Sequence, residues 1–99
     1  MDLVESNIDA TKALCKSHYV SQLFVFGFVL TNRFKKNSDI DLIVDFQGID
    51  PYNYADNYFD LKDSLERLFN REVDLLEDKA IQNPYLRQYI DSSKQLIFS

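Results

Sequence analysis

The sequence predicts a small α/β domain, because segments with helical spacing of apolar residues alternate with short apolar segments typical of strands. The chain has 99 residues, which suffices for one domain, expected over residues 1–99, and not for two. A hydrophobic content of 45% supports one modest core. Periodicity leaves the order and direction of the strands open, so a two-layer and a three-layer arrangement both fit.

The first predicted element is a helix over residues 4–18. Its buried stripe is expected at positions with helical spacing, which are Ile8, Thr11, Leu14, Cys15 and His18. Ser6 or Asn7 is placed to cap the start of this helix. His18 is interpreted as a residue of the helix end, since no second histidine or cysteine lies at zinc-ligand spacing.

Two strands are predicted next. Residues 22–28 are rich in aromatic and β-branched side chains, as is typical of a buried strand, and Gly27 ends it. Residues 29–35 predict a short helical turn. Residues 39–46 alternate, so that one face of the strand is apolar and the other face carries aspartates.

The second half of the chain predicts a loop, two helices and two further strands. Residues 47–53 contain glycine and proline and indicate a loop, and residues 54–70 carry the clearest apolar stripe of a helix. Residues 72–77 predict a short strand. Asn83–Ser93 predicts a helix with proline in its first turn, and residues 94–98 predict a closing edge strand.

Composition excludes several classes of function. The net charge of −5 argues against direct binding to nucleic acid or to an anionic membrane, because both would repel the chain. Cys15 is the only cysteine, which excludes an internal disulfide and fits the reducing cytoplasm. No signal peptide and no apolar run of membrane-spanning length is recognised, so we expect a cytoplasmic protein.

Three aspartates form the candidate site. Asp39 and Asp41 lie two apart on a predicted strand, so their side chains point the same way and repel unless a cation joins them. Mg²⁺ takes oxygen ligands of this kind. If the strand that carries Asp74 is a neighbour, the three carboxylates could hold two metal ions for an in-line displacement at phosphorus. The alternative is a solvated strand end beside a turn.

Residues beside the aspartates could meet phosphate. Gly27 precedes the predicted helical turn, whose free N–H groups could bind a phosphate. Ser38 could contact a nucleotide or cap the turn. The basic side chains of Arg33, Lys35 and Lys36 could meet phosphate, or could belong to a solvated loop.

The spacing of these residues resembles a known family. Gly27-Phe28, ten residues, and Asp39-Ile40-Asp41 resemble the G-S-x10-D-x-D signature of the polymerase-beta-type nucleotidyltransferase superfamily. The surrounding VFG, SDIDLIVDF and REVDLLE are similar to the minimal nucleotidyltransferases (MNT proteins) in order and spacing. The resemblance runs from about residue 6 to the end.

The resemblance implies a fold and a reaction. The implied fold is a mixed β-sheet with helices packed mainly on one face. Asp39 and Asp41 would ligate Mg²⁺ ions that hold the triphosphate of ATP, while Gly27, residue 28 and Ser38 would contact the nucleotide. Asp74 would bind the catalytic metal and help to deprotonate an acceptor hydroxyl.

The resemblance also implies a partner. AMP would pass to a hydroxyl of another protein, and a HEPN-type toxin is the implied partner of such an antitoxin. Because larger relatives carry another domain that holds the acceptor, we expect the acceptor in a second chain or in a second copy of this one.

The sequence departs from the family signature at residue 28, where phenylalanine replaces serine. Phe28 lacks the hydroxyl and adds a ring where the triphosphate should pass. An alternative hypothesis is therefore a binding module that neutralises its partner by direct contact, without catalysis. A third hypothesis is a modifier of small molecules related to antibiotic nucleotidyltransferases.

Overall fold

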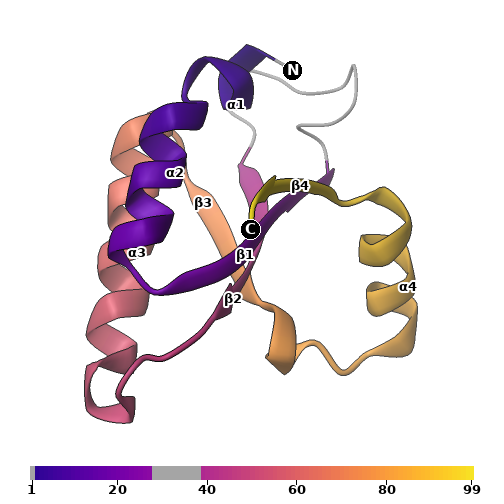
Figure 1. Ribbon diagram of the computed structural model, residues 1–99. Helices are drawn as coiled ribbons and strands as arrows, with labels where there is room; N and C mark the ends of the chain where they lie inside the picture. The colour runs from indigo at the N-terminus through magenta and orange to yellow at the C-terminus, as the bar shows by residue number, and fades with distance from the viewer. Residues whose placement is uncertain (1, 28–38) are drawn as a thin grey trace.

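The computed structural model describes residues 2–27 and 39–99, which form one four-stranded sheet with helices on both of its faces (Figure 1). The strands are β1 (Val20–Phe26), β2 (Ile40–Phe46), β3 (Val73–Glu77) and β4 (Gln95–Phe98), in the order β3-β2-β1-β4. β1 pairs antiparallel with β2 and with β4, whereas β2 pairs parallel with β3. The sheet is therefore mixed, as the resemblance implied.

Four α-helices are described. They are α1 (Asp2–Ser6), α2 (Ile8–Ser17), α3 (Tyr54–Phe69) and α4 (Pro84–Ser93). Two 3-10 helices, η2 (Pro51–Asn53) and η3 (Asp78–Ala80), lie in the connections. In Figure 1, α2 and α3 lie together on one side of the sheet and α4 lies on the other. None of the helices in the described residues is long and apolar enough to cross a membrane.

The main core fills the space between the sheet and the helices α1 to α3. From β2 it takes the apolar alternate positions that the sequence predicted, which are Ile40, Leu42, Val44 and Phe46. From α3 it takes Leu61, Leu65 and Phe69, with Tyr58 and Leu68 half-buried at its border. Both patterns confirm the predicted facing of these two elements.

A smaller core lies on the opposite face, under α4. Phe26, Ile43 and Ile90 are buried together there, and Phe24 and Leu76 pack against them. Ile43 belongs to the same face of β2 as Asp41, because side chains alternate along a strand. The face that carries the candidate site is thus partly covered by α4.

The first predicted helix is divided at Asn7, which is a correction to the expectation of one helix over residues 4–18. The Asn7 side chain donates a hydrogen bond of 2.8 Å to the Leu3 carbonyl, and its backbone N–H bonds to the Val4 carbonyl. Asn7 occupies the N-cap position of α2 but makes no side-chain cap bond there. A side chain that binds the preceding turn competes with the helix backbone and ends α1.

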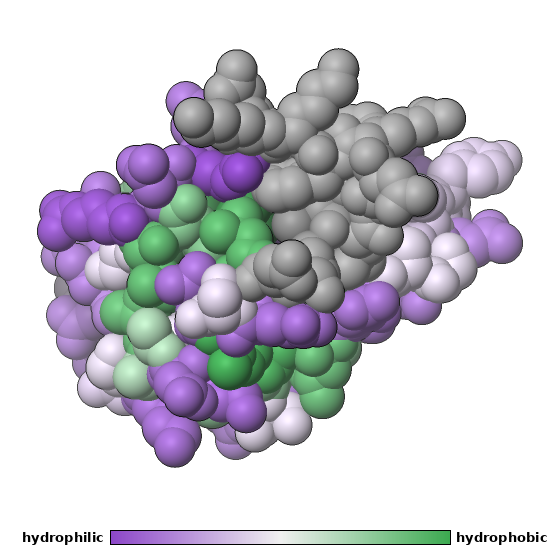
Figure 2. Space-filling view, turned by 90° about the horizontal axis from the view of Figure 1, so that it is seen from above, coloured by the Kyte–Doolittle hydropathy of each residue, from purple (hydrophilic) through white to green (hydrophobic). Residues whose placement is uncertain are grey.

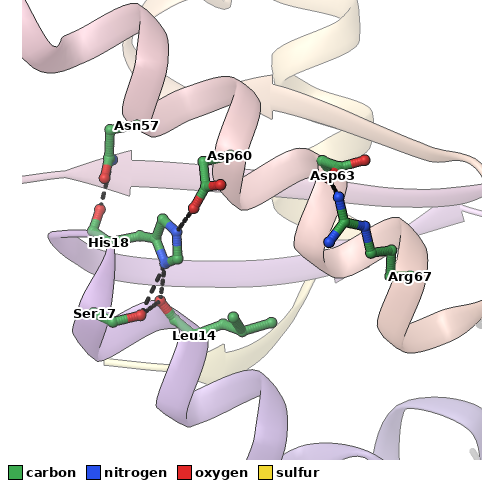
Figure 3. Close-up of polar contacts among 7 residues, drawn as sticks. All are labelled: Leu14, Ser17, His18, Asn57, Asp60, Asp63 and Arg67. Carbon is green, nitrogen blue, oxygen red and sulfur yellow. Dashed lines mark hydrogen bonds and ion pairs between the residues drawn. The ribbon is translucent and has the colours of Figure 1, made fainter.

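His18 joins α2 to α3 (Figure 3). It is the C-cap residue of α2, as interpreted from sequence, and its side chain is buried. Nδ1 lies 2.7 Å from the Leu14 carbonyl oxygen, and Nε2 lies 2.6 Å from Asp60 Oδ2 on α3. The Asn57 side chain donates a further bond of 2.8 Å to the His18 carbonyl. The histidine is therefore a structural link between two helices.

Candidate functional site

Gly27 ends β1 in a conformation that suits glycine. Its φ angle is +84°, which L-amino acids with a side chain rarely adopt. A Cβ atom at this position would lie only 2.3 Å from Oδ2 of Asp41. The backbone angle therefore favours glycine, and any side chain here would have to displace the Asp41 carboxylate.

Asp41 and Asp74 lie side by side on neighbouring parallel strands. The register of β2 and β3 pairs Asp41 with Asp74, and the register of β1 and β2 pairs Asp41 with Phe26. Both aspartates are on the face of the sheet opposite the main core, since Leu42 and Leu75 next to them are core residues. Asp39 directly precedes β2 and is exposed. The structure thereby pairs Asp41 with Asp74, and it places Asp39 one residue before the strand that carries Asp41.

The pKa of Asp41 is raised to about 6, first by burial and then by the neighbouring carboxylates. Burial is the largest cause, because the half-buried carboxylate loses water that would solvate its charge. Repulsion from Asp74 and then from Asp39 adds to the effect. A cation at this point would cancel the repulsion and offset the effect of burial, because its positive charge favours the ionised carboxylate.

The donor chemistry fits a hard divalent cation, although the described side chains do not already surround one point. Asp39, Asp41 and Asp74 offer carboxylate oxygens, which Mg²⁺ prefers. Within residues 2–27 and 39–99, no three His, Cys, Asp or Glu side chains lie close enough together to hold a metal ion. The paired Asp41 and Asp74 are the residues that would have to close around it.

The remaining site residues that the sequence named lie outside the described residues. These are Phe28, Arg33, Lys35, Lys36 and Ser38, together with the helical turn predicted over residues 29–35. Their expected contacts with a nucleotide stay predictions.

Helix α4 places one aromatic residue, Tyr89, near the site, and sequence reasoning did not assign it there. The Tyr89 ring packs edge-on against Phe26, with centroids 6.5 Å apart and planes inclined by 77°. Phe26 is paired with Asp41 across the two strands, so Tyr89 contacts a residue that is next to Asp41. The only signal in the sequence was the spacing of Tyr89 and Ile90 on an amphipathic helix, which does not say which face of the sheet that helix covers.

A second feature missed from sequence lies along β3. Tyr58 was assigned to the apolar stripe of α3, yet its hydroxyl donates a hydrogen bond to the Leu75 carbonyl. Burial raises the pKa of Tyr58, with smaller contributions from Asp74 and Glu77. A tyrosine in a stripe otherwise made of leucine and phenylalanine was the available signal, because a buried hydroxyl needs a partner.

An open apolar pocket of about 410 Å³ lies between α3 and β3. It is lined by Tyr54, Ala55, Tyr58, Phe59, Leu75, Leu76 and Glu77. None of the three site aspartates lines it, so it is separate from the carboxylates. Seen from above in Figure 2, apolar surface lies to the left of the centre and toward the lower edge, with hydrophilic residues among it.

The chain matches a known family over most of its length. Residues 7–99 match the family model described as "Polymerase beta, Nucleotidyltransferase". Two proteins of Methanocaldococcus jannaschii, each named "Putative protein adenylyltransferase", are both 34% identical to it. One aligns over 80 residues, covering 81% of this chain and 79% of the relative, and the other over 83 residues, covering 81% and 80%.

Solved structures share the fold. One described as "Structure of putative minimal nucleotidyltransferase" superposes with a TM-score of 0.77 at 28% identity, covering 96% of this chain and 95% of that chain. A crystal structure of a toxin-antitoxin with AMP-PNP superposes with a TM-score of 0.72 at 19% identity, covering 94% and 73%. A tri-AMPylated Shewanella oneidensis HEPN toxin in complex with MNT antitoxin matches with a TM-score of 0.65 at 17% identity, covering 96% and 71%.

The last two similarities, below 20% identity, concern the fold alone. The family model and the two archaeal relatives carry the assignment by sequence, and it agrees with the mixed sheet and with the paired aspartates beside Gly27. The chain therefore belongs to the polymerase-beta-type nucleotidyltransferase family.

Proposed function

We propose that this protein transfers AMP from Mg–ATP to a hydroxyl group of a partner protein, and that it acts in this way as the antitoxin of a HEPN-type toxin. The observation that carries the proposal is the pairing of Asp41 with Asp74 on neighbouring strands, next to the glycine that ends β1. Family membership supplies the class of reaction.

Each aspartate has a distinct role in this proposal. Asp39 and Asp41 would hold the divalent ions, and the raised pKa of Asp41 marks the position where a cation is most needed. Bound Mg²⁺ would neutralise the triphosphate and make the α-phosphorus more electrophilic. Asp74 is exposed, so a hydroxyl carried by another molecule can reach it.

The chain's own part in the transfer is to orient the reactants and to accept a proton. Asp74 takes the proton of the acceptor hydroxyl while the oxygen of that hydroxyl forms a bond to the α-phosphorus. The bond from that phosphorus to the bridging oxygen breaks, and pyrophosphate leaves. Gly27 leaves space beside Asp41 because it has no side chain.

A protein acceptor is supported by the relatives. The archaeal relatives are named as protein adenylyltransferases, and one neighbour of the same fold is an MNT antitoxin in complex with an AMPylated HEPN toxin. The net charge of −5 favours a partner with a basic contact surface, because opposite charges steer association.

A second candidate function is a binding module that neutralises its partner without catalysis. Phe28 favours it, since this residue replaces the serine of the family signature. Loss of one hydrogen bond to a charged phosphate costs about 1.5–3 kcal/mol, or about one to two decades of affinity.

Titration calorimetry with Mg–ATP separates the two functions. The natural chain, Phe28→Ser and Asp41→Asn should be compared. If the transferase is intact, the natural chain binds in the micromolar to sub-millimolar range and Asp41→Asn does not. Binding by Phe28→Ser alone would favour the binding module. Equal binding by Asp41→Asn and the natural chain would refute the assigned site.

A further inference from the structure

Asp74 is flanked by two residues that helix α3 holds through side-chain hydrogen bonds. The backbone N–H of Val73, on one side of Asp74, donates to Oε2 of Glu66 at 3.0 Å. The carbonyl of Leu75, on the other side, accepts a bond of 2.5 Å from the Tyr58 hydroxyl. The third carboxylate of the site thus lies between two anchoring points.

Both contacts lie on the outer edge of the sheet. β3 is an outer strand in the order β3-β2-β1-β4, so among the described strands only β2 pairs with it. Ile40 N–H bonds to the Glu72 carbonyl, which therefore points toward β2. Because successive residues of a strand direct their backbone groups to opposite edges, Val73 and Leu75 direct theirs away from β2. Glu66 and Tyr58 fill positions that a further strand would otherwise occupy.

The order of the two contacts follows the geometry of the α3–β3 unit. Glu66 lies near the end of α3 and contacts the first residue of β3, whereas Tyr58 lies about two helical turns earlier and contacts a residue farther along the strand. A helix that runs back along a strand makes contacts in this order. The two side chains therefore define one position of β3 along the helix.

The register of β3 decides where Asp74 points. A shift of one residue would turn Asp74 toward the main core and would bring Val73 or Leu75 to the site, since side chains alternate between the two faces. A strand of five residues with one described neighbour has few ladder bonds to resist such a shift. Side-chain contacts from α3 add resistance to such a shift on the edge of β3 that no described strand covers.

We propose that Tyr58 and Glu66 are positioning residues that hold β3 in the register that sets Asp74 beside Asp41. The inference rests on the proposed function, in which Asp74 is the third metal-binding carboxylate. Neither side chain contacts the site directly, because α3 packs on the face of the sheet opposite Asp74. Both residues act through the backbone on either side of it.

The first test is amide hydrogen exchange of residues 73–77, which needs no ligand and no activity. Tyr58→Phe removes the hydroxyl and keeps the ring, and Glu66→Ala removes the acceptor. We expect exchange in β3 to become about three- to tenfold faster in both variants. Glu66→Gln keeps an oxygen that accepts from Val73 N–H and should restore the natural rate.

Matched controls come from the same part of the chain. Tyr52→Phe also removes a tyrosine hydroxyl, but Tyr52 is 95% exposed. Asp63→Ala also removes a carboxylate from α3, but Asp63 pairs with Arg67 on the surface of the helix. Neither control should change exchange in β3.

The second test is the affinity for Mn²⁺ alone, measured as free Mn²⁺ by electron paramagnetic resonance, so that residue 28 and the nucleotide play no part. Tyr58→Phe and Glu66→Ala should each weaken Mn²⁺ binding about three- to tenfold, and Glu66→Gln should not. In the Asp74→Asn background, the same two changes should have no further effect, because they act through Asp74.

The outcomes separate the inference from the proposed function. Unchanged exchange in Tyr58→Phe and Glu66→Ala overturns the anchoring of β3, whatever the metal does. If Tyr58→Phe or Glu66→Ala weakens Mn²⁺ binding further in the Asp74→Asn background, the positioning role is overturned. Absence of Mn²⁺ binding by the natural chain, with faster exchange in the variants, overturns the proposed metal site and with it the role of the anchors in metal binding.

Discussion

Gly27 and Asp41 approach so closely that a Cβ atom on residue 27 would lie 2.3 Å from the Asp41 carboxylate oxygen Oδ2. The glycine ends β1 and the aspartate lies near the start of β2, so the contact joins two strands at one end of the sheet. It combines the two parts of the family signature in one place, and it provides a sharp test of that signature.

Gly27→Ala should destabilise the fold by about 2–4 kcal/mol, because alanine is strained at positive φ and its Cβ would displace Asp41. Gly48→Ala is the matched control, since Gly48 has a φ of +76° and nothing lies within 4 Å of its Cβ position. The control should lose only about 1 kcal/mol. Urea unfolding of both variants measures the difference, and equal losses would show that the Asp41 contact is unimportant.

Asp41 should make stability depend on pH in the absence of metal. Its pKa in the folded protein is about 6, above the value of 3.8 for an unperturbed aspartate, so the folded state retains a proton that the unfolded state releases. The contribution of Asp41 to the stability of the folded state is therefore largest below about pH 4, and it is lost as the pH rises through about 6. Full conversion of the pKa difference gives about 3 kcal/mol, which solvent screening of a half-exposed group reduces to about 1 kcal/mol.

Asp41→Asn removes this pH dependence and should be more stable than the natural chain at pH 7 by about 1 kcal/mol. Urea unfolding of both proteins from pH 4 to pH 7, without divalent cations, measures the effect. A variant that is less stable at pH 7 and keeps the same slope would mean that repulsion at Asp41 does not strain the fold. A gain in stability on loss of a functional charge is typical of sites that need like charges close together.

The contact between His18 and Asp60 should contribute more to the stability of the fold than the neighbouring ion pair of Asp63 with Arg67 (Figure 3). Asp60→Ala leaves the buried His18 Nε2 without its partner and should cost about 1–2 kcal/mol. Asp63→Ala breaks an exposed pair and should stay within about 0.5 kcal/mol. Thermal unfolding of the two variants compares them directly, and similar losses would exclude a special role for His18 in joining α2 to α3.

The packing of helix α4 on the sheet should depend on Ile90. This residue is fully buried with Phe26 and Ile43 in the smaller core. Ile90→Ala should destabilise the protein by about 2–4 kcal/mol. Leu86→Ala on the same helix removes a side chain that is 40% exposed and should change stability by at most about 0.5 kcal/mol. A loss below about 1 kcal/mol for Ile90→Ala in urea unfolding would mean that α4 is held by other contacts.

Elements with strong local signals were predictable from the sequence. The alternation over residues 39–46 placed Ile40, Leu42 and Val44 in the core and the aspartates on the other face, as observed. The asparagine before Pro84 caps the helix that was predicted there, through bonds of its side chain to Tyr85 N–H and Leu86 N–H. These features depend on side chains close in sequence, so the sequence alone contains the information.

The division of the first helix could not be read from spacing. Apolar residues continue through Asn7 at helical intervals, whereas the bond from its side chain back to Leu3 ends α1. Asparagine can cap a helix start or bind the preceding turn, and periodicity does not distinguish the two.

The sequence by itself determined which carboxylates and which glycine carry the family spacing, and that Asp41 faces away from the apolar side of its strand. These follow from alternation and order along the chain. Only the tertiary structure decided that β3 lies parallel to β2 with Asp74 beside Asp41, that α4 partly covers the site face, and that Tyr58 and Glu66 bond to the backbone of β3. Register and layer order arise from packing between distant segments, where several arrangements bury the same apolar residues. The choice among them depends on contacts that no local pattern encodes.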